Sequence, residues 1–133
     1  MSSFACAINC MDGRVQGAVK DHMQKVYGVT FVDMVTEPGP NKILAEGTSQ
    51  PVVQNIKRRV GISVNHHGAK IIAIVAHGDC AGCAESKEKQ CDHLRTAKKT
   101  VESFGFNAEI TLLWVGYDFN AVEIVSDRGP IIV

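Results

Sequence analysis

The sequence lacks both a long apolar run and an excess of charge of one sign. Its apolar stretches fall far short of the roughly 20 residues that a membrane span needs. Fourteen basic residues balance fourteen acidic ones, so nothing attracts a nucleic acid or an anionic membrane surface. The first residues have no basic leader and no long apolar segment, and we expect no signal peptide there. These absences exclude membrane and nucleic-acid partners from the expected functions.

The cysteines are also not arranged for disulfide bonding. There are five, an odd number, and they are not spread as in a secreted disulfide framework. We therefore expect a cytoplasmic protein with free or metal-bound thiols. A chain of 133 residues can bury roughly two-thirds of its unfolded surface without staples. With no repeat and no linker, residues 1–133 are expected to form a single domain.

Apolar periodicity predicts alternating strands and helices. Strands are expected at 4–9, 29–35 and 70–76, with a hairpin of two strands between 108 and 125, and helices at 14–27, from Pro51 onward, and at 85–104. This order favours an α/β fold with a mostly parallel central sheet, helices on both faces and a C-terminal antiparallel edge hairpin. In such sheets, ligands collect at the carboxyl ends of the strands.

Two short segments follow strands and carry metal-binding side chains. "CMDGR" follows the first strand, and "HGDC" follows the apolar run at 70–76. If these strands are neighbours, Cys10, His77 and Cys80 converge at one edge of the sheet. Two sulfurs and one nitrogen suit zinc, and three protein ligands leave a fourth position for water or substrate.

The loop after the second of these strands has its own local expectations. Gly78 is expected to relax the backbone at the bend. Asp79 is expected to cap the helix that follows. If Cys80 lies at the start of that helix, the partial positive charge there favours its thiolate.

The two segments together resemble the β-class carbonic anhydrases. The shared pattern is C-x-D-x-R near the N-terminus and H-x-x-C about seventy residues later, and the likeness runs roughly from Phe4 to Val125. The resemblance implies that Cys10, His77 and Cys80 bind zinc. It implies that Asp12 and Arg14 form a dyad beside the metal, with Asp12 able to swing onto it as a fourth ligand.

The activity implied by the resemblance is a carbonate dehydratase, a zinc-dependent lyase. Its zinc-bound hydroxide attacks carbon dioxide and gives bicarbonate, in a reversible reaction. The resemblance also implies a homodimer or higher homo-oligomer, in which a second subunit completes the pocket. The partner of the site is then a small-molecule substrate.

The chain is a short, divergent relative of that family. We expect the N-terminal arm of the family to be absent, because the first strand is expected almost at Met1, and "TEPGP" at 36–40 replaces the Arg-Asn-Ala-Gly turn typical of the family. Glu37 brings a negative charge to this turn, and Cys83 is an added thiol near the site. A related possibility is hydrolysis of carbon disulfide or carbonyl sulfide on the same zinc site.

Two readings from other classes stay open. Cys80 and Cys83 form a C-x-x-C pair, as in thiol-redox proteins. Alternatively, Asp12 or Cys83 fills the fourth zinc position permanently, which gives a zinc-binding protein without catalysis. The remaining candidates are expected to carry no chemistry: Cys6 as a core residue, Cys91 on the polar half of its helix, and His22 and His93 on exposed faces.

Overall fold

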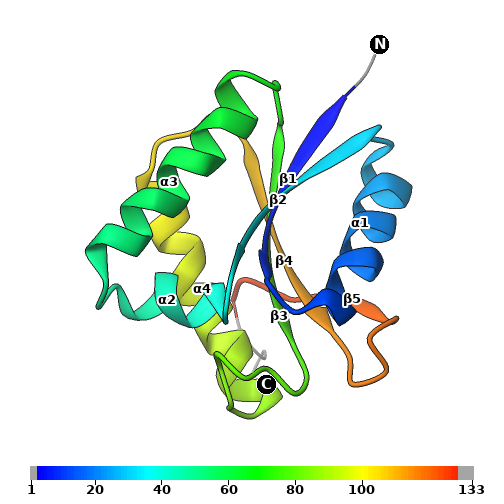
Figure 1. The fold of residues 1–133 in the computed structure, drawn as a ribbon, viewed down its shortest axis with the longest axis vertical. Coiled ribbons are helices and arrows are strands. Elements are labelled where there is room, and N and C mark those ends of the chain that lie inside the picture. Colours follow the sequence, from blue (N-terminus) through cyan, green and yellow to red (C-terminus); the bar gives the residue numbers. More distant parts are fainter. Residues whose placement is uncertain (1–2, 129–133) are drawn as a thin grey trace.

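A computed structural model gives the structure of the protein and describes residues 3–128. Strands and helices alternate along most of the chain (Figure 1). The elements in order are β1 (Phe4–Cys10), α1 (Gly13–Tyr27), β2 (Phe31–Glu37), α2 (Pro40–Glu46), α3 (Gln50–Asn65), β3 (Ile71–His77), α4 (Lys87–Ser103), β4 (Glu109–Val115) and β5 (Val122–Ile124). None of the helices in this part of the chain is both long and apolar enough to cross a lipid bilayer.

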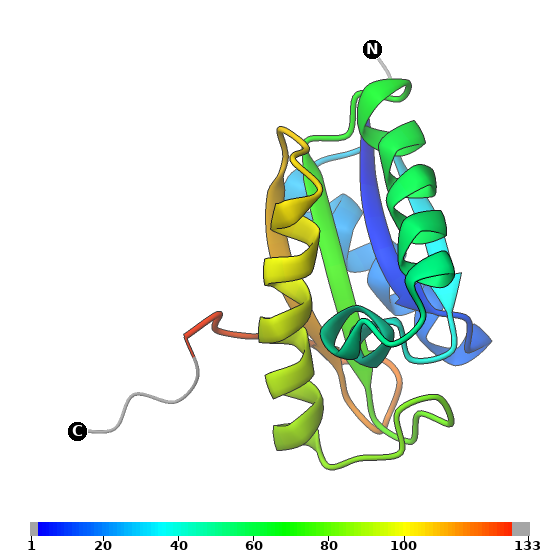
Figure 2. The same ribbon diagram turned by 90° about the vertical axis from the view of Figure 1, so that its left-hand side faces the viewer.

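The strands form one sheet in the order β2-β1-β3-β4-β5. Neighbouring strands are parallel except β4 and β5, which are antiparallel. Helix α1 covers one face, and α2, α3 and α4 cover the other (Figures 1 and 2). The predicted α/β fold, with a mostly parallel sheet, helices on both faces and an antiparallel C-terminal pair, is confirmed.

Helix α1 shows how the sequence sets the elements. The Asp12 side chain caps its first turn by accepting from the backbone N–H of Arg14 at 2.9 Å. Val15, Val19 and Met23 recur at spacings of four residues and are fully buried against the sheet. Gly28 ends the helix with φ at 66°, a left-handed conformation that glycine adopts without steric cost.

The element boundaries differ from the predicted ones in two places that matter for the site. Helix α2 was not predicted, although Pro40 in its first turn and the left-handed Gly47 after it are typical helix boundaries. Helix α4 begins at Lys87 rather than residue 85, because Ser86 caps it by accepting from the backbone N–H of Lys89. Residues 78–86 are therefore a loop, and it lies against α2.

The order of the strands changes direction between β1 and β3. From β1 the chain passes outward to β2, and it then returns to place β3 on the other side of β1. Cys6, Ala7 and Ile8 of β1 pair with 72–74 of β3 in parallel register. The carboxyl ends of β1 and β3 consequently lie side by side, at the position where open α/β sheets bind ligands.

Two loops approach each other closely at this end of the sheet. A Cβ atom on Gly39 would lie 2.7 Å from the backbone carbon of Gly82. A Cβ atom on Gly82 would in turn overlap the backbone of Pro38. The loop at 78–86 can therefore pack on the turn before α2 only because both positions lack a side chain.

We expect Gly82→Ala to lower the free energy of unfolding by about 1–3 kcal/mol, because the added methyl group overlaps backbone that cannot move aside. Gly17→Ala is the matched control. Nothing lies within 4 Å of its added methyl group, and alanine in a helix is favoured by about 0.5–1 kcal/mol. Urea unfolding measures both, and equal stabilities for the two variants would contradict the described loop packing.

Candidate metal centre

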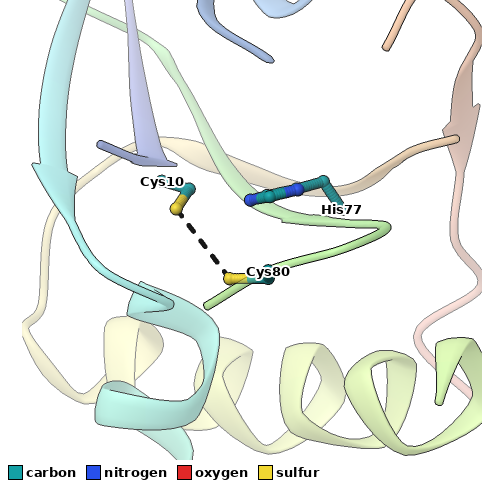
Figure 3. Close-up of side chains that lie close together, drawn as sticks. All are labelled: Cys10, His77 and Cys80. Carbon is teal, nitrogen blue, oxygen red and sulfur yellow. Dashed lines mark hydrogen bonds between the residues drawn. The ribbon is translucent and has the colours of Figure 1, made fainter. Parts of the chain in front are cut away.

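Cys10, His77 and Cys80 come together at the carboxyl ends of β1 and β3 (Figure 3). Cys10 is the last residue of β1, His77 is the last residue of β3, and Cys80 follows in the next loop. Each of the three has one sulfur or nitrogen atom within 4.8 Å of the corresponding atoms of the other two. They are at most 4% exposed. Residues seventy positions apart in the chain thus form one buried donor group.

The orientation of the His77 ring leaves one nitrogen without a partner. Its Nδ1–H donates to the carbonyl oxygen of Gly78 at 2.7 Å, because a carbonyl can only accept. The lone pair is therefore on Nε2, which is buried and has no hydrogen-bond partner. A metal-binding histidine typically has this arrangement, in which a backbone carbonyl fixes the tautomer and the second nitrogen binds the ion.

The two thiols of the group share a proton. The sulfurs of Cys10 and Cys80 lie 3.9 Å apart. The side-chain contacts with Cys80 and His77, together with the backbone amides of Gly39 and Asp12, lower the pKa of Cys10, while burial opposes this. The proximity of the Cys10 thiolate and burial raise the pKa of Cys80. The site therefore favours one thiolate beside one thiol. Ionisation of the second thiol requires a cation between the sulfurs.

Backbone amides and one buried amide side chain hold this group in place. The pKa of Cys80 is lowered in part by the backbone amides of Gly82 and Cys83, which oppose the larger effect of Cys10. These loop amides take the role that we expected from a helix N-terminus, since α4 begins only at Lys87. Gln90, 1% exposed, donates to the carbonyl oxygens of His77 at 3.0 Å and Glu85 at 3.2 Å.

Asp12 and Arg14 form the predicted pair beside this group. Arg14 Nη2 donates to Asp12 Oδ2 at 2.7 Å, and Arg14 Nε donates to Asp12 Oδ1 at 3.1 Å. The guanidinium lowers the pKa of Asp12 to about 2, so the carboxylate is ionised at neutral pH. Each of its oxygens accepts from Arg14, and Asp12 is not among the residues of the donor group.

Two residues that support Arg14 were not predicted for that role. The Asp79 carboxylate accepts from Arg14 Nη1 at 3.3 Å, and the Asp79 carbonyl oxygen accepts from Arg14 Nη2 at 3.3 Å. Asp79 does not cap the following helix as expected, because the cap of α4 is Ser86. The guanidinium carbon also lies 4.2 Å from the centre of the Phe119 ring, a cation–π contact. Nothing in the sequence around Phe119 could identify it, because its contact depends on how the loop after β4 folds back.

Gly78 was expected to relax the backbone at the bend, and this reason for a glycine at position 78 was wrong. The left-handed residue of this loop is Asp79, with φ at 57°, rather than Gly78. Gly78 is needed for space, because a Cβ atom there would lie 2.5–2.7 Å from the ring of Tyr117. A short polar side chain such as aspartate tolerates the left-handed region better than most residues do.

The side chains of the remaining candidates do not belong to the donor group. The Cys83 sulfur lies 3.8 Å from Asn41 Nδ2, outside the group with Cys10, and Cys80 and Cys83 are both free thiols. The Glu37 carboxylate pairs with Arg59 of α3, so its charge is balanced. Cys91 was expected on a polar face, but it is 7% exposed and packs in the core, as Cys6 does.

The donor group matches the requirements of zinc. Two thiols and one imidazole nitrogen form a common zinc ligand set, and His77 Nε2 is buried without a geometric hydrogen bond to residues 3–128. A divalent cation would also let both sulfurs ionise. The Cys10–His77–Cys80 group resembles the zinc site of the β-carbonic anhydrases in its residues and in its position on the sheet.

A sequence-family model described as "Putative carbonic anhydrase" matches residues 1–126 of this chain. The chain belongs to this family. No curated protein sequence matches it. Membership of this carbonic anhydrase family agrees with the resemblance inferred from the two short motifs, which lie in the matched range.

Several solved carbonic anhydrases share the fold. The enzyme from Streptococcus mutans is 15% identical with a TM-score of 0.53, and the match covers 92% of this chain and 81% of that one. The β-carbonic anhydrase CafA of Aspergillus fumigatus is 12% identical with a TM-score of 0.54, and the match covers 97% of this chain and 77% of that one. The carbonic anhydrase of Glaciozyma antarctica is 10% identical with a TM-score of 0.54, and the match covers 92% of this chain and 81% of that one. Identities this low establish a common fold alone.

We expect Asp12→Ala to lower the free energy of unfolding by about 1 kcal/mol at pH 7, because the α1 cap is lost. Arg14 depresses the pKa of Asp12. The stabilisation that the Asp12 carboxylate gives the fold is therefore fully present at pH values above the ordinary pKa of an aspartate, and it is lost as the pH falls toward 2. The difference between wild type and variant, measured by urea unfolding, should therefore shrink between pH 4 and 2. Asp21→Ala, on the same helix, is the control, and a pH-independent difference for Asp12→Ala would refute the assignment.

Proposed function

We propose that this chain binds a zinc ion through Cys10, His77 and Cys80 and catalyses the reversible hydration of carbon dioxide to bicarbonate. The observation that carries the proposal is the buried donor group with its unpartnered Nε2, at the strand ends where α/β sheets bind ligands. Membership of the carbonic anhydrase family supports the same activity.

When bound, zinc supplies Lewis acidity, which brings the pKa of a water molecule to about 7. The three donors come from two strand ends and one loop. They would leave the fourth coordination position of a zinc ion for the reacting molecule. The Asp12 carboxylate is turned to Arg14 and does not fill this position. This arrangement favours an open site over a permanently closed zinc protein.

The Asp12–Arg14 pair supplies orientation and charge. An ionised Asp12 can accept a hydrogen bond but cannot donate one, so it orients the O–H bond of the reacting water. Arg14 keeps that carboxylate fixed and places a positive charge near the anionic product. Arg14 also lines a surface pocket of about 480 Å³ beside Phe119, so the pair is reachable from solvent.

The overall reaction is CO₂ + H₂O giving HCO₃⁻ and one proton. The same donor group could act on carbon disulfide or carbonyl sulfide, so a hydrolysis assay on these linear molecules belongs beside the hydration assay. Zinc bound at this group with neither activity between pH 7 and 9 would instead identify a non-catalytic zinc protein.

Cys80→Ser is expected to lower the zinc content by one equivalent per chain, because it removes one of two thiolate ligands. Cys91→Ser is the matched control: its thiol is also buried, but it lies in the core on α4 and outside the donor group. Elemental analysis of the purified proteins measures the difference. Unchanged zinc in Cys80→Ser would show that the metal binds elsewhere.

Arg14→Ala is expected to keep its zinc and lose about 10–100-fold in kcat/KM for carbon dioxide, as is typical when a residue that orients a metal site is removed. Arg95→Ala is the control, because Arg95 also bonds a carboxylate and a carbonyl oxygen but lies on α4 near Ser126. Stopped-flow hydration with a pH indicator measures both. Full activity in Arg14→Ala would remove the dyad from the mechanism.

A further inference from the structure

A second group of metal-binding side chains lies on the other side of the same loop. Cys83 and Glu85 belong to residues 78–86, and His93 is on α4. One sulfur, oxygen or nitrogen atom from each lies within 4.8 Å of the other two. Within residues 3–128, this group and the Cys10 group are the two that meet this description.

The three side chains converge on a single carboxylate oxygen. His93 Nε2 lies 2.6 Å from Glu85 Oε2, and the Cys83 sulfur lies 3.9 Å from the same oxygen. Cys83 is fully buried, and the side chains of His93 and Glu85 are 12% and 26% exposed. His93 was expected on an exposed face, and the low exposure of its side chain shows that this part of the expectation was wrong.

We propose that Cys83, Glu85 and His93 form a second zinc site, separate from the Cys10–His77–Cys80 group. Sulfur, imidazole nitrogen and carboxylate oxygen are all ligands that zinc accepts. Neither group shares a residue with the other. Ion binding releases the thiol proton, and the proton between His93 Nε2 and Glu85 Oε2 passes to solvent or to the other ring nitrogen.

Lys42 both helps and opposes this site. Its Nζ lies 3.4 Å from Glu85 Oε1, which holds that oxygen and leaves Oε2 turned toward Cys83 and His93. Its positive charge also repels a cation a few ångströms away. The thiolate and the carboxylate together carry two negative charges against one from Lys42, so a divalent ion remains favoured.

The competing explanation for this group is a hydrogen-bonded clamp. The contacts of Glu85 with Lys42 and His93 join the loop to α2 and α4. A clamp of this kind stabilises the loop without any metal. The two explanations differ in zinc stoichiometry, which does not depend on catalysis at the first group.

The test is the zinc content of the full chain after incubation with excess Zn²⁺ and removal of loosely bound ions by desalting. We expect two equivalents for the wild type, one for Cys83→Ser, one for Cys80→Ser and none for the double variant. A Cys80→Ser protein that retains no zinc would overturn the second site. A Cys83→Ser protein that matches the wild type would do the same.

Two further variants separate a zinc ligand from a clamp residue. His93→Gln keeps a donor for Glu85 but removes the zinc-binding nitrogen, so it should lose the second equivalent while keeping the melting temperature of the metal-free wild type. Lys42→Met removes a like charge, so it should bind the second Zn²⁺ several-fold more tightly. Unchanged zinc content in the first variant, or weaker binding in the second, would contradict the proposal. Cys91→Ser should retain both equivalents.

Discussion

The parallel pairing of β1 with β3 is the constraint on which the site depends. It joins residues 6–8 to 72–74, and it sets the last residues of both strands, Cys10 and His77, at one edge of the sheet. The burial of the two strands fixes this register, because a shift by one residue would turn every buried side chain to the opposite face. The position of the donor group therefore follows from core packing rather than from the loops around it.

Electrostatics then decides what the donor group can hold. Three donors in a buried site favour one shared negative charge and leave a nitrogen lone pair without a partner. An unsatisfied buried polar atom costs free energy, and a ligand bound to Nε2 would remove that cost. The Arg14–Asp12 pair lies outside this group, with the Asp12 carboxylate bonded to Arg14.

Most of the fold and the donor group could be predicted from the sequence, because they depend on local periodicity and on strand ends. The alternating pattern gave the parallel sheet, and the cysteine and histidine directly after two strands gave the cluster. What was missed depends on tertiary contacts. Helix α2 is short, with Pro38 before it and Pro40 as its first residue, and Asp79 and Phe119 reach Arg14 only through the folded loops. The predicted homodimer and the cytoplasmic location stay predictions.

The central claim is that sulfur from β1 and sulfur from the loop after β3 bind one ion together with His77. Anomalous diffraction at the zinc absorption edge, on crystals of the zinc-loaded protein, tests it most directly. The account predicts a peak about 2.3 Å from the sulfurs of Cys10 and Cys80 and about 2.0–2.1 Å from His77 Nε2. An ordered, reduced site without a peak between these atoms would contradict it.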